Sequence, residues 1–202
     1  MSLLKKNVVM ALSLFATACV PIWQQRPETS PEALWEARRI ALTQLDRWKI
    51  QGRTAIVQGR EGWNAGLHWR EDKGSYQIKI LGPFSQGGVS LEGNDEHVIL
   101  TMADGEKLSS TDPELLITKA LGVQLPINAL RDWIRGLPYA EEEFESITFD
   151  VEGRITHLLQ QGWEITFSRY VPFKQYSMPS KIFIRRSEQN LRLVITRWES
   201  VQ

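Results

Sequence analysis

The chain has 202 residues, with 24 basic and 24 acidic side chains and a single cysteine. This length suits one domain with a sizeable core. The balanced charge provides no overall basic footprint of the kind that nucleic-acid-binding proteins carry. One cysteine excludes an internal disulfide. The eight tryptophans, several of them on predicted strands, fit a protein that lines a wide apolar interior.

Residues 1–18 have the parts of a bacterial secretory signal. A pair of lysines precedes an apolar stretch at 8–15, and Ala16-Thr17-Ala18 forms a small-residue cleavage site. The apolar stretch is too short to span a membrane. Cys19 follows directly, and this placement resembles the lipobox of bacterial lipoproteins, although Ala16 stands where that motif usually has leucine. An ordinary cleaved signal followed by a chance cysteine is the alternative.

The lipobox resemblance implies a lipid anchor. The Cys19 thiol would receive a diacylglyceryl group and the new amino terminus an N-acyl group, and we expect no other cofactor. Residues 19–31 contain three prolines and no hydrophobic period, which is typical of a tether. Val20 stands where aspartate would retain an enterobacterial lipoprotein in the inner membrane, so the expected address is the outer membrane. Residues 32–202 then form the folded domain.

A helix is predicted directly after the tether. Ser30 can act as its N-cap and Pro31 suits its first position. The helix is expected to run to about Asp46. Its apolar stripe is predicted to comprise Leu34, Ala37, Ala41, Leu45 and Trp48.

From residue 48 the hydrophobic period changes from helical to two, which predicts a meander of short antiparallel strands. Such a succession indicates an up-and-down barrel or a strongly curved sheet. Asp104-Gly105 has the chemistry of a type I′ hairpin turn. The predicted strands lie near 48–56, 63–69, 76–80, 89–91 and 98–102, with further turns near Glu61-Gly62, Asp72-Lys73-Gly74 and Gly93-Asn94-Asp95.

An apolar bend interrupts the meander at residues 81–88. Gly82 and Pro83 break the strand, and a Gly-Gly pair lets the chain reverse. Phe84 therefore falls where turn chemistry normally places polar residues. We expect either an exposed ring that contacts a partner or a ring that folds back onto its own core.

Two helices and a second group of strands complete the chain. Asp112-Pro113 predicts the start of a helix that ends at Leu121 before Gly122, and Pro126 predicts the start of another that runs to Ile134. Their apolar surface is too large for mutual burial, so we expect both to lie across the open end of the sheet. Strands are predicted at 144–151, 154–160, 163–170, 181–186 and 191–198, with hairpins at Glu152-Gly153 and Gln161-Gly162 and an edge or strand start at Met178-Pro179.

No catalytic or metal-binding constellation is evident. His68, His97 and His157 lie in separate predicted strands without partners at metal-ligand spacing, and are expected to be exposed strand residues. The acidic run at 141–143 is interpreted as a solvated segment. The sequence therefore predicts a protein that is not an enzyme and holds no metal.

Several segments together resemble the LolB family of outer-membrane lipoprotein receptors. The most specific is GVQLPINALRDWIRGLP at 122–138, which is similar to the lid segment of that family. The bend Gly82–Phe84 lies where the family has Asn-Pro-Leu-Gly, and Leu-x-Ile-x-x-Trp at 193–198 also fits. Phe84 stands in the place of leucine and Gly82 in the place of asparagine. The resemblance covers nearly the whole chain after the signal.

The resemblance implies a fold, a function and partners. The fold is an unclosed antiparallel β-barrel of about eleven strands with a helical lid over an apolar cavity. The protein would be a monomer at the outer membrane that receives acylated lipoproteins from the periplasmic carrier LolA and inserts them into outer-membrane lipid, with Gly82, Pro83 and Phe84 as its membrane-insertion loop. The candidate cavity residues are Trp48, Ile50, Trp63, Leu67, Trp69, Tyr76, Ile78, Ile80, Val89, Leu91, Leu100, Leu130, Trp133, Trp163, Ile165 and Phe167.

Plain core packing is the alternative role for each cavity residue. Two other classes of protein are also open at this point. A soluble carrier of the LolA type would share the barrel without an acylated Cys19. A periplasmic hydrolase would depend on a residue such as Ser90, Glu92 or one of the histidines.

Overall fold

The computed structural model describes residues 30–82 and 87–201. Within these ranges the chain forms three α-helices and one antiparallel sheet of eleven strands. The helices are α1 (Pro31–Thr43), α2 (Pro113–Leu121) and α3 (Ile127–Trp133). The strands are β1 (Arg47–Gln58), β2 (Glu61–Asp72), β3 (Ser75–Leu81), β4 (Gly88–Gly93), β5 (Val98–Thr101), β6 (Lys107–Ser110), β7 (Ser146–Phe149), β8 (Ile155–Gln160), β9 (Trp163–Phe173), β10 (Tyr176–Arg186) and β11 (Gln189–Glu199).

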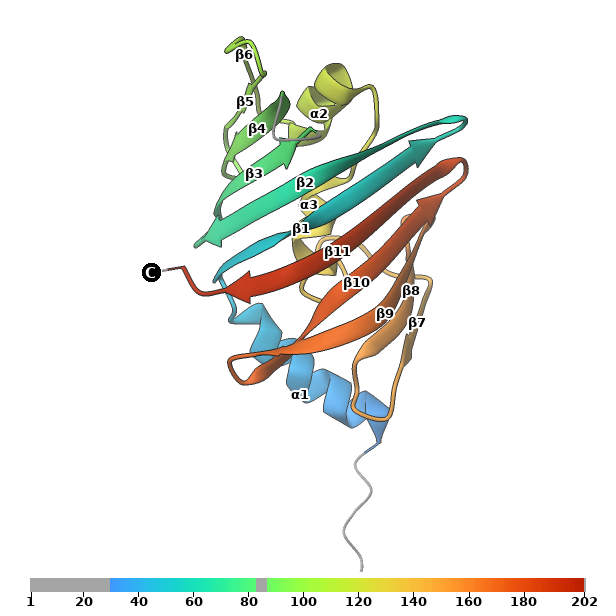
Figure 1. Cartoon of the computed structure of the whole chain (residues 1–202). Helices are drawn as coiled ribbons and strands as arrows, with labels where there is room; N and C mark the ends of the chain where they lie inside the picture. The colour runs from blue at the N-terminus through green and yellow to red at the C-terminus, as the bar shows by residue number, and fades with distance from the viewer. Residues whose placement is uncertain (1–29, 83–86, 202) are drawn as a thin grey trace, which may run out of the picture.

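The sheet is strongly curved and unclosed. Its strand order is β6-β5-β4-β3-β2-β1-β11-β10-β9-β8-β7, so β6 and β7 are edges with one neighbour each. The chain starts in the middle at β1, runs outward to β6, crosses to β7 and returns inward to β11, which pairs with β1. Figure 1 shows this path, with α3 behind the central strands. The expected fold class is confirmed.

Backbone conformation explains the tightest hairpins. Lys73 and Gly74 have φ of 52° and 86°, and Gln161 and Gly162 have 55° and 69°. Two positive φ values in a two-residue loop match the right-handed twist of the flanking strands. Both predicted turns are therefore confirmed. The β1–β2 turn was wrongly placed: Gln58 pairs with Glu61, so the turn lies two residues before the expected position.

The type I′ prediction at Asp104-Gly105 was wrong. Only Gly105, with φ of 91°, has a positive φ, and its N–H donates to the carbonyl of Met102 over 3.0 Å. The hairpin is thus a turn over 102–105 that ends in a left-handed glycine. Asp104 instead caps the loop, because its side chain accepts from the N–H of Glu106.

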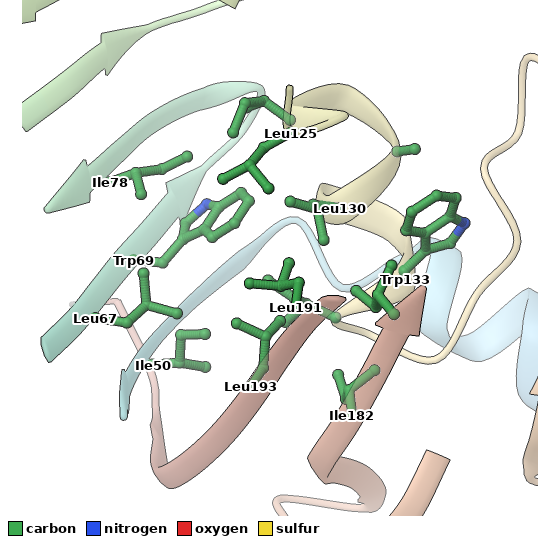
Figure 2. Close-up of a cluster of buried hydrophobic side chains, with 14 of the residues drawn as sticks. Ile50, Leu67, Trp69, Ile78, Leu125, Leu130, Trp133, Ile182, Leu191 and Leu193 are labelled. Carbon is green, nitrogen blue, oxygen red and sulfur yellow. The ribbon is translucent and has the colours of Figure 1, made fainter. Parts of the chain in front are cut away.

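The boundaries predicted for α2 and α3 are confirmed. The Asp112 side chain accepts from the N–H groups of Glu114 and Leu115, and Gly122 ends α2 with φ of 71°. Both helices bury apolar residues, but their placement differs from the expectation. They lie over the inner face of the curved sheet, where side chains of α3 meet those of the central strands (Figures 1 and 2).

The apolar stripe predicted for α1 was wrong. Ala37 and Ala41 are exposed, and the helix ends at Thr43. The buried helical residues are Trp35 and Leu42, which lie seven positions apart and share one face. Trp35 stacks on Phe149 of β7 with ring centroids 5.3 Å apart, and this aromatic contact sets the rotation of the helix.

The C-terminal strands differ from prediction in length. β7 is shorter than expected, whereas β9 and β10 extend further, so that Met178-Pro179 lies inside β10 and does not start it. Proline is tolerated there because β10 pairs with β11 only from Lys181 onward, which leaves Pro179 on a local edge. The Pro179 carbonyl accepts from the indole N–H of Trp198 over 2.9 Å.

Candidate lipid-binding site

The inner face of the sheet and the inner side of α3 form one hydrophobic cluster. Side chains at every second position of the central strands point inward because strand side chains alternate between faces. Figure 2 shows those of β1, β2, β3, β10 and β11 converging on residues of α3 and the segment before it. The labelled residues are Ile50, Leu67, Trp69, Ile78, Leu125, Leu130, Trp133, Ile182, Leu191 and Leu193.

The structure brings the predicted cavity residues together. All of them except Trp63 are buried in this cluster, and Trp63 packs against it half-buried. Trp48 lies between Trp69 and Trp198, with ring centroids 6.0 and 5.4 Å away. The side chains are packed against one another, so their part in holding an acyl chain stays a prediction.

Sequence reasoning missed an equally central part of the cluster. No residue of β10 or β11 was named as a cavity residue, although both strands lie in the middle of the sheet. The alternation of apolar residues along β11 was a signal that could have identified them. The missed residues are Ile182, Ile184, Leu191, Leu193, Ile195 and Trp198, together with Val123, Leu125 and Ile127 before and within α3.

A buried ion pair attaches α3 to the sheet. The Arg131 guanidinium donates to both oxygens of Glu71 on β2, with Nε–Oε1 of 2.9 Å and Nη2–Oε2 of 3.2 Å. The indole N–H of Trp69 also donates to Glu71 over 3.2 Å. Arg131 further donates to Asp95 and lies 4.9 Å above the ring of Tyr76. One arginine thus links α3 to β2, to β3 and to the loop between β4 and β5.

Burial and pairing act in opposite directions on this ion pair. Burial raises the pKa of the Glu71 carboxyl, and the hydrogen bonds from Arg131 and Trp69 reduce that rise without cancelling it. Burial also lowers the pKa of Arg131, but hydrogen bonds to Glu71 and Asp95 raise it by more. The bidentate geometry favours the ionised pair. The charge on Glu71 therefore depends on Arg131 remaining in place.

A second polar contact holds the segment after α3. Gln160 is fully buried, and its carbonyl accepts from the indole N–H of Trp133 over 2.9 Å and from the N–H of Tyr139 over 2.8 Å. Its amide donates to the carbonyls of Tyr139 and Glu142. All four hydrogen-bonding positions of this side-chain amide are satisfied. We call α2, α3, the segment between them and the segment directly after α3, residues 113–139, the lid.

The lid also contacts α1. Arg135, just beyond α3, donates through Nη1 to the carbonyls of Leu42 and Leu45, each over 3.2 Å. The Leu42 carbonyl belongs to the last turn of α1, where cations are favourable, and the Leu45 carbonyl belongs to the link between α1 and β1. The lid is therefore held at its far end by three polar residues, Arg131, Arg135 and Gln160, whereas its middle makes apolar contacts.

Two pockets border the lid. One of about 450 Å³ is bordered by Trp48, Glu71, Arg131 and Arg135. Another of about 510 Å³ is bordered by Leu115, Trp163 and Arg186, and the Arg186 guanidinium lies 4.2 Å above the Trp163 ring. Trp48 and Trp163 thus connect the apolar cluster with the surface.

The predicted membrane-insertion loop falls largely outside the described residues. Pro83 and Phe84 are not described, so the structure does not test the predicted role of Phe84. Gly82 is half-buried, and its N–H donates to the carbonyl of Gly87 over 3.4 Å. Gly88 follows with φ of 134°, and a Cβ there would lie 2.3 Å from the carbonyl oxygen of Ile80. This close approach requires glycine at the return of the bend.

The described residues contain no group of histidine, cysteine and acidic side chains that could hold a metal ion. His68 is exposed on β2, His97 precedes β5, and His157 is half-buried beside Glu164 at 3.2 Å. Ser90, considered for hydrolysis, donates to Glu92 over 3.1 Å. None of the described helices is long and apolar enough to cross a membrane.

The fold defines the class of protein. A LolA superfamily protein from Nitrosomonas europaea has a similar structure, with a TM-score of 0.57 and 7% sequence identity over 86% of this chain and 94% of that one. A DUF1329 family protein from Desulfovibrio piger has a TM-score of 0.53 and 8% identity over 85% and 94% of the two chains. At such identities the likeness concerns the fold alone, and it places the chain in the structural class of unclosed, strongly curved antiparallel sheets covered by helices.

Sequence comparison defines the family within this class. The model of the family "Outer membrane lipoprotein LolB" matches residues 46–198. The outer-membrane lipoprotein LolB of Nitrosococcus oceani is 34% identical over 192 residues, which are 95% of each chain. That of Pseudomonas paraeruginosa is 32% identical over 182 residues, 86% of this chain and 88% of its own. The chain belongs to the LolB family of outer-membrane lipoproteins, and the expected resemblance is confirmed.

We predict that Glu71→Ala destabilises the protein and loosens the lid. Removing Glu71 leaves Arg131 with only the exposed Asp95 as an ion-pair partner, and breaking a buried pair in this way costs about 3–5 kcal/mol. The free energy of unfolding should fall by this amount in chemical denaturation, and amide exchange should accelerate in α3 first. The matched control is Asp72→Ala, which removes exposed ion pairs with Arg47 and Arg70 and should cost less than about 1 kcal/mol. Equal losses for the two variants would show that the buried pair does not hold the lid.

Proposed function

We propose that this protein receives acylated lipoproteins from a LolA-like periplasmic carrier and inserts them into the outer membrane. Membership of the LolB family supports an outer-membrane lipoprotein with this trafficking role. The observation that carries the proposal is the apolar inner face of an unclosed sheet, covered by a helix whose far end is held by polar contacts. An acyl chain can take the place of the apolar side chains of such a helix in contact with the inner face of the sheet.

The energetics of transfer fit this arrangement. Moving each acyl CH₂ out of water contributes about 0.8 kcal/mol. Transfer from the carrier to the inner face and onward to the bilayer exchanges one apolar environment for another, so no covalent step is needed. The direction of transfer follows if the affinity for the acyl chains increases from the carrier to this protein and from this protein to the bilayer. We therefore propose that the protein acts without catalysis.

The proposed function is tested by transfer of cargo between the purified proteins. A lipoprotein bound to its LolA-like carrier is mixed with this protein, and cargo is followed by co-purification. Acylated lipoprotein should move to this protein, because the acyl chains supply the binding energy. The control is the same lipoprotein with its acylated cysteine substituted, which should not be captured. Equal capture of the two forms would contradict a lipid-binding inner face.

The lipid anchor is a separate proposal, because Cys19 lies outside the described residues. The motif Ala16-Thr17-Ala18-Cys19 favours acylation, and dual acylation suffices for stable membrane residence. We predict that Cys19→Ala releases the protein from membranes while cargo still moves to it from the carrier. Membrane fractionation and the transfer assay measure the two effects. A released protein that accepts no cargo would place the anchor within the receiving site.

A role of Phe84 in membrane insertion is likewise proposed from the sequence. A ring in this bend can enter the bilayer interface, and burying one large apolar side chain contributes about 1.5–3 kcal/mol. Phe84→Glu should leave acceptance of cargo intact and slow its insertion into liposomes by about tenfold or more. Phe84→Leu is the matched control and should remain close to the native rate. A melting temperature lowered by several degrees in Phe84→Glu would place the ring in the core instead.

A further inference from the structure

The outer face of the sheet carries a cluster of basic side chains across four neighbouring strands, β1, β11, β10 and β9. The register places Arg53 of β1 opposite Val194 of β11, Val194 opposite Lys181 of β10, and Lys181 opposite Arg169 of β9. Arg192 lies two residues before Val194 on β11, opposite Phe183 of β10. We call Arg53, Arg169, Lys181 and Arg192 the outer basic face. Figure 1 looks onto these strands, with α3 behind them.

These four cations have no ion-pair partner among the described residues. Two carboxylates of the same strands are engaged elsewhere. Glu164 of β9 accepts from Arg185 over 2.8 Å, and Glu199 of β11 is 2.8 Å from Lys49. The positive charge of the outer basic face is therefore uncompensated, although the whole chain has as many acidic as basic side chains.

The arrangement is unfavourable for the isolated fold. Lys181 and Arg169 lie directly opposite each other on paired strands, where like charges destabilise a sheet. The ring of Phe183 makes cation–π contacts with two of the cations. Lys181 Nζ lies 5.2 Å and Arg192 Cζ 5.7 Å from the ring centroid. The cations are thus held in place close to one another. An anionic partner would turn this repulsion into attraction.

We propose that the outer basic face rests on the surface of anionic phospholipid headgroups. This inference depends on the proposed function, because it takes the protein to be anchored at the membrane. Four cations with apolar Val194 and Phe183 between them suit a lipid interface, where aromatic and basic side chains act together. Ser30 begins the described fold only eleven residues after Cys19, so an extended tether spans at most about 40 Å. The anchor therefore keeps this face at high local concentration near the headgroups.

The proposal gives the anchored domain a definite orientation. β1 and β11 are the central strands of the curved sheet, so they form the crest of its convex side. When the crest lies on the bilayer, the lid on the other side of the sheet faces away from it. The carrier then reaches the lid without competing with the membrane for the same surface.

The experiment uses the acylated full chain in vesicles and one engineered cysteine. Acylation consumes Cys19, so the new thiol is the only one to label. Asn64→Cys lies on the outer side of β2, beside Ala55 in the register, and Lys119→Cys on exposed α2 is the control position. A fluorophore at residue 64 should be quenched by spin-labelled headgroups in vesicles of phosphatidylcholine with phosphatidylglycerol. Quenching should be weak in pure phosphatidylcholine and at residue 119 in both vesicle types.

Charge variants then test the cations themselves. Arg53→Gln and Arg192→Gln should each weaken the anionic-lipid contribution about fivefold, and the double variant should weaken it about 25-fold. Lys119→Gln, which removes one charge from α2, should have no effect. The Arg53 and Arg192 variants should keep their melting temperature and should still accept lipoprotein from the carrier. Failure of cargo transfer in the native protein would refute the proposed function without bearing on the quenching comparison.

The proposal fails if quenching at residue 64 is the same in both vesicle types or is insensitive to the double variant. It also fails if anionic vesicles have no effect and the carrier protects residue 64 instead. If Cys19 proves unacylated, co-sedimentation of the chain with the same two vesicle types makes the same comparison.

Discussion

The path of the chain across the open sheet determines how the apolar interior is covered. Because β1 and β11 pair in the middle, the first group of strands ends at one edge and the second begins at the other. The connection from Ser110 to Ser146 must therefore cross the molecule, and it does so over the concave face. A sheet with one apolar face needs such a covering layer. α2 and α3 lie in this crossing segment, so the segment that connects the two groups of strands also covers the apolar face of the sheet.

This covering segment is held in two physically different ways. Its middle contributes apolar side chains such as Leu130 and Trp133, which another hydrocarbon could replace at little cost. Its end is held by Arg131 and Gln160, whose contacts depend on geometry and have no substitute in an acyl chain. The apolar contacts therefore tolerate exchange with lipid, whereas the polar contacts define a single closed position to which the segment returns.

Local signals predicted much of this fold, whereas long-range contacts escaped prediction. The caps of α2 and the positive-φ turns follow from a few adjacent residues, and they were predicted correctly. The face of α1 was missed because Trp35 is oriented by Phe149, more than a hundred residues away. Glu71 was not recognised either, although it continues the inward alternation of Leu67 and Trp69. A carboxylate is normally expected to face solvent, so its burial at this inward position could not be predicted without knowing that Arg131, sixty residues further on, pairs with it.

The pairing of β1 with β11 has a consequence for the order of assembly. Gly52 pairs with Ile195, so the joint between the two halves of the sheet is formed by residues from opposite ends of the chain. Such a contact closes a very long loop and forms slowly. Until β11 is in place, β1 and β10 are exposed edges that can join a neighbouring molecule. β11, synthesised after the ten other strands of this sheet, thus seals it, and a chain interrupted before residue 189 would be left as two aggregation-prone half-sheets.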